Sequence, residues 1–150
     1  MATPLSTLNK LIEILKDGQN GFQAAAADVD NSELKTLFSQ YSLQRSTFAG
    51  ELQALAQSLG ESDPPNSGSV AAALHRGWMD IKAAIASKDE HAILAECERG
   101  EDFAVAAYKE ALEQPGLPMN IVDTIRTQAA QVKSVHDHVR KMRDALAPVS

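Results

Sequence analysis

The stretch that decides the fold covers residues 96–108 and reads Glu96-Cys97-Glu98-Arg99-Gly100-Glu101-Asp102-Phe103-Ala104-Val105-Ala106-Ala107-Tyr108. Spacings of three and four residues alternate along one side of this stretch and its neighbours, which predicts a long amphipathic helix. The positions on that side are Leu94, Cys97, Glu101, Ala104, Tyr108 and Ala111. Glu101 therefore faces the predicted core, where an unpaired carboxylate costs on the order of several kcal/mol. We expect a cation, a metal ion or several hydrogen-bond donors to compensate it.

The same spacing predicts three further long helices, which we place at about residues 4–29, 32–59 and 118–147. Thr3 before Pro4 is typical of a helix start, because proline fits the first helical position. Asn31 or Ser32 can cap the second helix, and Asp89 can cap the helix that contains Glu101. Each of these helices is long enough to span a domain of this size.

Between the second helix and Asp89 lies a crossover segment at about residues 60–88. It begins with Gly60 and the paired Pro64 and Pro65, which cannot continue a helix. A shorter helix from Ser69 to about Ser87 is predicted within it. A connection of this length can run along the whole bundle, so that the third long helix starts at the opposite end.

The composition agrees with an all-α protein of one domain, residues 1–150. One long crossover between two antiparallel hairpins is the arrangement of ferritin-like four-helix bundles, so we predict such a bundle with an extra helix in the crossover. Aromatic residues make up only 5% of the chain, and alanine and leucine dominate its apolar residues, which favours helix packing over a sheet.

Charge and cysteine content narrow the function classes. The net charge of -6, with both signs scattered along the chain, argues against nucleic-acid binding. Cys97 is the only cysteine, so no internal disulfide can form, and we interpret it as a small buried apolar group. No stretch approaches the roughly 18 to 20 apolar residues of a membrane span. We expect a cytoplasmic protein with no membrane association.

Five short motifs together resemble a bacterial ferritin-like four-helix-bundle family of unknown function that is distantly similar to bacterioferritin. They are Asp17-Gly18-Gln19-Asn20-Gly21-Phe22, Arg45-Ser46-Thr47-Phe48-Ala49-Gly50-Glu51-Leu52, His75-Arg76-Gly77-Trp78, Glu98-Arg99-Gly100-Glu101-Asp102 and His136-Asp137-His138. The resemblance covers nearly the whole chain. It implies a ferritin-like four-helix bundle, and this family has no established reaction.

Ferritin-like proteins commonly hold two metal ions with a Glu from each of two helices and a Glu-x-x-His from each of the other two. This chain departs from that pattern, because its second helix has no histidine, and Lys133 and Val135 stand three residues before His136 and His138. A reduced set could still hold one iron, manganese or zinc ion. Its candidate ligands are Asp17, Glu98, Glu101 and His136.

A buried polar network is the alternative to a metal. Arg45 interrupts the core line of the second helix and lies about fourteen residues from Asn31, as Asp17 does on the first helix. Gly18 leaves room for its side chain, so we expect Arg45 to pair with Asp17 or Glu101. The same count from Pro115 places Gln128 level with Glu101. The predicted network is therefore Asp17, Arg45, Glu101 and Gln128.

These alternatives predict different functions. With the polar network and no cofactor, the chain is a non-catalytic bundle whose surface, self-association or unknown protein partner carries its role, for instance in stress survival. With the reduced ligand set, it is a metal-binding or oxygen-handling protein. Small residues such as Gly18 also allow an apolar ligand between the helices. No fingerprint of a common enzyme family is present.

Overall fold

The computed structural model describes residues 3–60 and 79–146. The predicted helix start at Ser69, the paired Pro64 and Pro65 and the motif His75-Arg76-Gly77-Trp78 lie outside the described residues. Within them the chain is helical, with no strand. The helices are α1 (Pro4–Asp28), α2 (Ser32–Ser58), a segment at 79–87, α4 (Glu90–Leu112) and α5 (Met119–Ala145). This confirms the prediction of an all-α protein.

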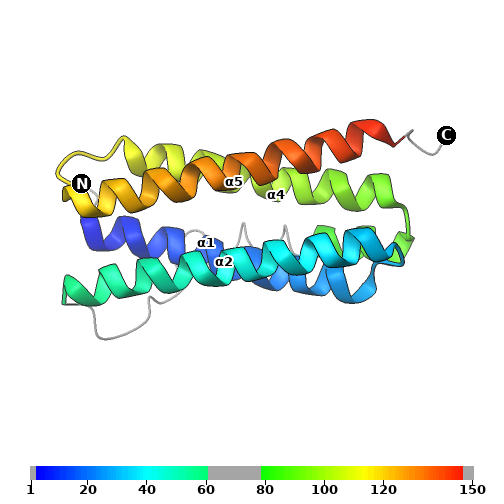
Figure 1. Ribbon diagram of the computed structural model, residues 1–150, viewed down its shortest axis with the longest axis horizontal. Helices are drawn as coiled ribbons and strands as arrows, with labels where there is room; N and C mark the ends of the chain where they lie inside the picture. The colour runs from blue at the N-terminus through cyan, green and yellow to red at the C-terminus, as the bar shows by residue number, and fades with distance from the viewer. Residues whose placement is uncertain (1–2, 61–78, 147–150) are drawn as a thin grey trace.

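The four long helices lie side by side as two antiparallel hairpins, α1 with α2 and α4 with α5 (Figure 1). The hairpins contact each other through α1 against α4 and α2 against α5. In Figure 1, α2 ends at one end of the bundle and α4 begins at the other, so these two helices run in the same direction. The end of α2 and the start of α4 therefore lie at opposite ends of the bundle, as the sequence predicts.

Local sequence explains where the helices begin. The side chains of Thr3, Asn31 and Asp89 each accept hydrogen bonds from backbone N–H groups in the first turn of α1, α2 and α4. These N–H groups have no partner within a helix, so a short polar side chain at this position stabilises the helix start. α5 begins after Pro118 without such a side-chain bond.

The core consists of two apolar clusters on either side of a polar layer. One cluster contains Phe48 of α2 and Ala104 of α4, and the other contains Tyr41 and Cys97 of the same helices. The buried charged residues between these positions in sequence are Arg45 on α2 and Glu98 and Glu101 on α4. The bundle therefore has a charged layer near its middle.

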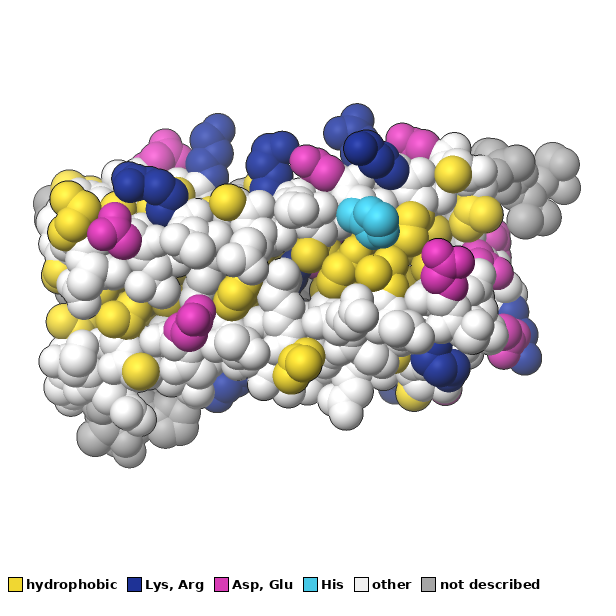
Figure 2. Space-filling view, in the orientation of Figure 1, with side chains coloured by type: hydrophobic (Ala, Val, Ile, Leu, Met, Phe, Trp, Pro, Cys, Tyr) yellow, Lys and Arg dark blue, Asp and Glu magenta, His cyan; other side chains and the backbone are white. Residues whose placement is uncertain are grey.

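The surface is mixed in character. Figure 2 shows side chains of both charges scattered over the face in view, with hydrophobic side chains visible where α5 and α2 meet. None of the helices in the described part of the chain is both long and apolar enough to cross a membrane.

Candidate functional site: a buried ion pair and a neighbouring polar cluster

A buried ion pair joins the two hairpins. Nη2 of Arg45 donates to Oε2 of Glu101 at 2.8 Å, and each side chain is only 2% exposed. Nε of Arg45 donates to Oε1 of Gln44 at 3.2 Å, and its guanidinium carbon lies 5.5 Å from the centre of the Phe22 ring. The pair thus gives each buried charge an opposite charge within hydrogen-bonding distance, which is the condition for burying it.

Gly18 of α1 lies beside the arginine. A Cβ atom at this position would be 3.7 Å from Cγ and 3.8 Å from Nη1 of Arg45, which is ordinary van der Waals contact. The missing side chain therefore provides space for the guanidinium, although an alanine would also fit. Asp17 lines the cavity next to the pair, while the salt bridge of Arg45 is made with Glu101.

The polar layer changes the titration of the groups around it. Burial raises the pKa of the Glu101 carboxyl, and the neighbouring Arg45 guanidinium opposes this rise without cancelling it. Burial and the nearby Glu101 raise the pKa of Cys97 to about 12. The same two causes raise the pKa of Tyr41 to about 12. Cys97 is thus a neutral buried thiol at pH 7, which suits its interpretation as an apolar group rather than a nucleophile.

Gln128 is buried but belongs to a different network from the predicted one. Its Oε1 accepts from the Tyr108 hydroxyl at 2.8 Å, and its Nε2 donates to the backbone oxygen of Phe48 at 3.3 Å and to Oε1 of Glu51 at 2.8 Å. Placing it level with Glu101 was therefore wrong. Side chains in a helix lean toward its N-terminus, so those of α4 lean away from the connecting turn and those of α5 lean toward it. A residue of α5 therefore meets a residue of α4 that lies closer to the turn than an equal count of residues indicates.

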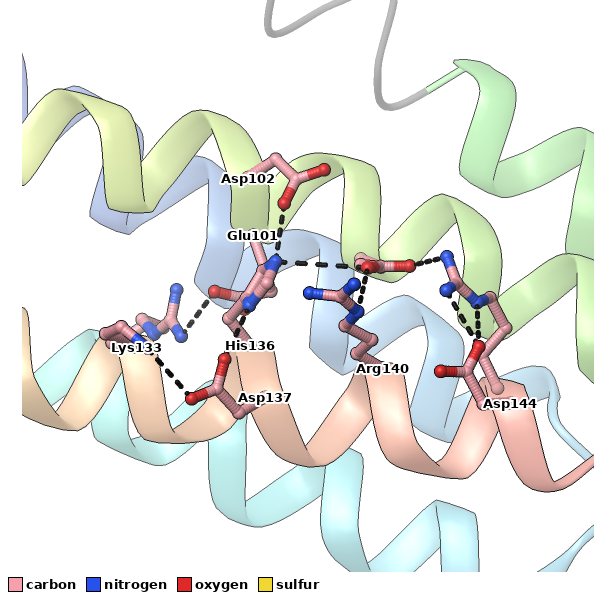
Figure 3. A network of polar contacts seen from close by, with 10 residues as sticks. Glu101, Asp102, Lys133, His136, Asp137, Arg140 and Asp144 are labelled. Carbon is pink, nitrogen blue, oxygen red and sulfur yellow. Dashed lines mark hydrogen bonds and ion pairs between the residues drawn. The ribbon is translucent and has the colours of Figure 1, made fainter.

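A second polar cluster lies between α4 and α5 (Figure 3). Nε2 of His136 is 2.5 Å from Oδ1 of Asp102 and 4.0 Å from Oε1 of Glu98. Ligand atoms of these three residues all lie within 4.8 Å of one another, the kind of grouping that can hold a metal ion. Glu98 also forms ion pairs with Arg143 and, at 3.9 Å, with Arg140.

His136 has two acidic partners. Partial burial by itself lowers its pKa, but hydrogen bonds to Asp137 and Asp102 outweigh this, so the pKa is raised. The bonds to His136 and Lys133 lower the pKa of Asp137. The cluster is therefore arranged to favour an imidazolium at His136.

The reduced ligand set of the sequence analysis is split between these two places. Glu98 and His136 come together, but Asp102 accompanies them, while Glu101 is paired with Arg45 and Asp17 lies at the cavity. Sequence reasoning missed Asp102. Its position four residues after Glu98 places both carboxylates on one side of α4, and this spacing was the available signal.

Comparison with known proteins gives one family. A family described as a domain of unknown function, DUF2383, matches residues 3–114. The chain belongs to this family. No curated protein matches it. The matched residues include α1, α2 and α4, so Arg45 and Glu101 lie within the match and His136 lies outside it. The match supports a helical family of unknown function. The description of this family does not mention ferritin-like proteins.

Proposed function

We propose that this DUF2383 protein is a non-catalytic, ferritin-like helical bundle that acts by binding, with an arginine–carboxylate layer in place of a complete di-metal site. The observation that carries the proposal is the salt bridge between Arg45 and Glu101, which are both 2% exposed. The course of the chain, two hairpins joined by one long crossover, is the arrangement known in ferritin-like bundles and supports the ferritin-like part.

The ion pair opposes metal binding at Glu101 for a physical reason. A metal ion that takes this carboxylate must displace Arg45, whose guanidinium would then be buried without a counter-charge. Breaking a buried pair in this way costs about 3–5 kcal/mol. The missing Glu-x-x-His motifs would leave such an ion with few other ligands. Both points favour a bundle that functions without a metal.

Metal content tests this proposal directly. The purified protein is loaded anaerobically with Fe(II) or Mn(II), desalted and measured by elemental analysis, beside Glu101→Gln and the matched control Glu110→Gln, an exposed glutamate on the same helix. We expect no metal whose binding depends on Glu101. Stoichiometric metal that is lost in Glu101→Gln and kept in Glu110→Gln would overturn the proposal.

A second candidate function is binding of one iron, manganese or zinc ion by Glu98, Asp102 and His136, and the 4.8 Å grouping of their ligand atoms favours it. Carboxylates with one imidazole suit these metals. The ion must compete with Arg143 for Glu98 and with a proton for His136. Zn(II) titration at pH 8 tests this site, with Asp102→Asn abolishing binding and Asp123→Asn, an equally exposed aspartate, leaving it unchanged.

The cellular setting belongs to the same proposal. We expect a cytoplasmic protein with a role in stress survival that self-associates through a long helix face. Analytical ultracentrifugation over a hundredfold concentration range tests the association, and a monomer throughout would contradict it.

A further inference from the structure

A cavity of about 320 Å³ adjoins the buried ion pair. Residues of α1, α2, α4 and the segment 79–87 line it. This volume lies at the lower end of the roughly 300–1,000 Å³ that is typical of ligand pockets. The cavity is therefore large enough for one short hydrocarbon chain.

The inner wall of this cavity is largely apolar. Its apolar side chains that are no more than 6% exposed are Ile14, Phe22, Cys97 and Ala104. The charged groups at the same depth, Arg45 and Glu101, form a salt bridge with each other. Hydrocarbon that is placed against such a wall is removed from water, which is favourable in proportion to the apolar area. A hydrocarbon group therefore matches the inner part of the cavity.

The outer edge of the cavity is polar and faces water. Arg99 is 61% exposed and pairs with Asp80, which is 51% exposed, at 3.0 Å. Gly100 is exposed as well, and an added Cβ there meets no atom within 4 Å, so the edge is open at this point. We define the rim of the cavity as Asp80, Glu96, Arg99 and Gly100. A polar group can remain hydrated at the rim while a chain attached to it fills the cavity.

We propose that this cavity binds the hydrocarbon chain of a small single-chain amphiphile, whose polar end stays at the rim. This inference rests on the proposed binding function and names its ligand class. Burial of the chain supplies the affinity, which therefore rises with each methylene group that enters the cavity. The charge of the polar end has a small effect, because the rim carries both signs and exposed charges are screened by water and salt.

Chain length tests this inference first. Hexanoate and octanoate, the latter below its micelle-forming concentration, are titrated into ¹⁵N-labelled protein at pH 7. The backbone amide signals of the lining glycines Gly18, Gly21 and Gly100 report binding. We expect saturable shifts at these signals and about tenfold or more tighter binding of octanoate, the effect of two further buried methylene groups. No saturable binding of octanoate, or equal affinities of the two chains, would overturn the proposal.

The charge of the polar end is tested with octylammonium, which has the same chain length as octanoate. We expect the two affinities to differ by less than about tenfold, because an exposed ion pair contributes at most about a fivefold change. A larger difference in either direction would show that the polar end is bound inside the cavity and would overturn its placement at the rim.

Two glycine variants locate the binding site without touching the buried ion pair. Gly100 lines the cavity and Gly50 on α2 does not, and at both of these exposed positions an added Cβ meets no atom within 4 Å. Gly100→Leu should weaken octanoate binding about tenfold or more by obstructing the cavity, while Gly50→Leu leaves it unchanged. Equal affinities in the two variants would place the site elsewhere. Metal analysis of the same samples shows separately whether the metal-free bundle itself is wrong.

Discussion

Arg45 and Glu101 are the residues whose pairing we expect to matter most for stability. In Arg45→Met the Glu101 carboxylate remains 2% exposed but loses its counter-charge. We expect the free energy of unfolding at pH 7 to fall by about 3–5 kcal/mol, the usual cost of an uncompensated buried charge. Urea denaturation followed by circular dichroism measures this change.

The double variant Arg45→Met/Glu101→Leu tests this explanation, because it removes both buried charges and should recover most of the lost stability. Lys10→Met serves as the control, since Lys10 and Glu110 form an exposed pair at 3.4 Å whose loss should cost less than about 1 kcal/mol. If Arg45→Met were no more damaging than Lys10→Met, the buried pair would not have the role assigned to it.

His136 should make stability depend on pH near neutrality. Its pKa is raised in the folded protein because the hydrogen bonds to Asp137 and Asp102 outweigh the effect of burial. The charged form therefore favours folding below the unfolded-state pKa of about 6.5, and this contribution is lost as the pH rises through the folded pKa. We expect a loss of no more than about 1 kcal/mol, because both aspartates are exposed.

Nuclear magnetic resonance titration of the imidazole signals measures this pKa directly. Asp102→Asn should lower the pKa of His136, and His136→Gln should remove its part of the pH dependence of stability. A pKa of His136 at or below that of an unfolded histidine would contradict the charged cluster.

At the scale of the helices, Asn31 connects two elements. Its Oδ1 accepts from the backbone N–H groups of Glu33 and Leu34 at the start of α2, and its Nδ2 donates to Oε1 of Glu90 at the start of α4 at 3.1 Å. We expect Asn31→Ala to reduce the free energy of unfolding by about 1 kcal/mol through loss of the cap.

Asn31→Asp separates the two contributions, because aspartate keeps the cap but places a second carboxylate against Glu90. It should be more stable than Asn31→Ala, and its stability should increase when Glu90 is also changed to Gln. Thermal unfolding of the four proteins gives the comparison. Equal stabilities of Asn31→Asp/Glu90→Gln and Asn31→Ala would show that the cap contributes little.

The helices could be predicted from the sequence because their signals are local. Thr3, Asn31 and Asp89 act on backbone groups within three residues, and the apolar spacing marks the buried face of each helix. Contacts between helices were harder, as Gln128 and Asp102 show. Gln128 meets Tyr108 because side chains lean along their helices, and Asp102 meets His136 because of how α4 and α5 are rotated. A count of residues along the chain gives neither the lean of the side chains nor the rotation of one helix relative to the next.

At the scale of the molecule, polar contacts between the hairpins add to the apolar core. The Arg45–Glu101 pair and the Asn31–Glu90 bond link the first hairpin with α4, and Gln128 of α5 binds Glu51 and the backbone oxygen of Phe48 on α2. Such bonds have strict geometry, whereas apolar contacts tolerate sliding. They therefore fix how one hairpin lies along the other.

Gln128→Leu tests this coupling between the hairpins. The substitution leaves the buried hydroxyl of Tyr108 without its acceptor, so we expect the free energy of unfolding to fall by about 1–3 kcal/mol. Adding Tyr108→Phe removes that hydroxyl and should cost less in the variant than in the parent protein, a non-additivity of about 0.5 kcal/mol or more. Combination with Asn31→Ala, which shares none of these partners, should be additive instead. Additive losses for Gln128→Leu and Tyr108→Phe would mean that the two side chains do not stabilise the bundle as one unit.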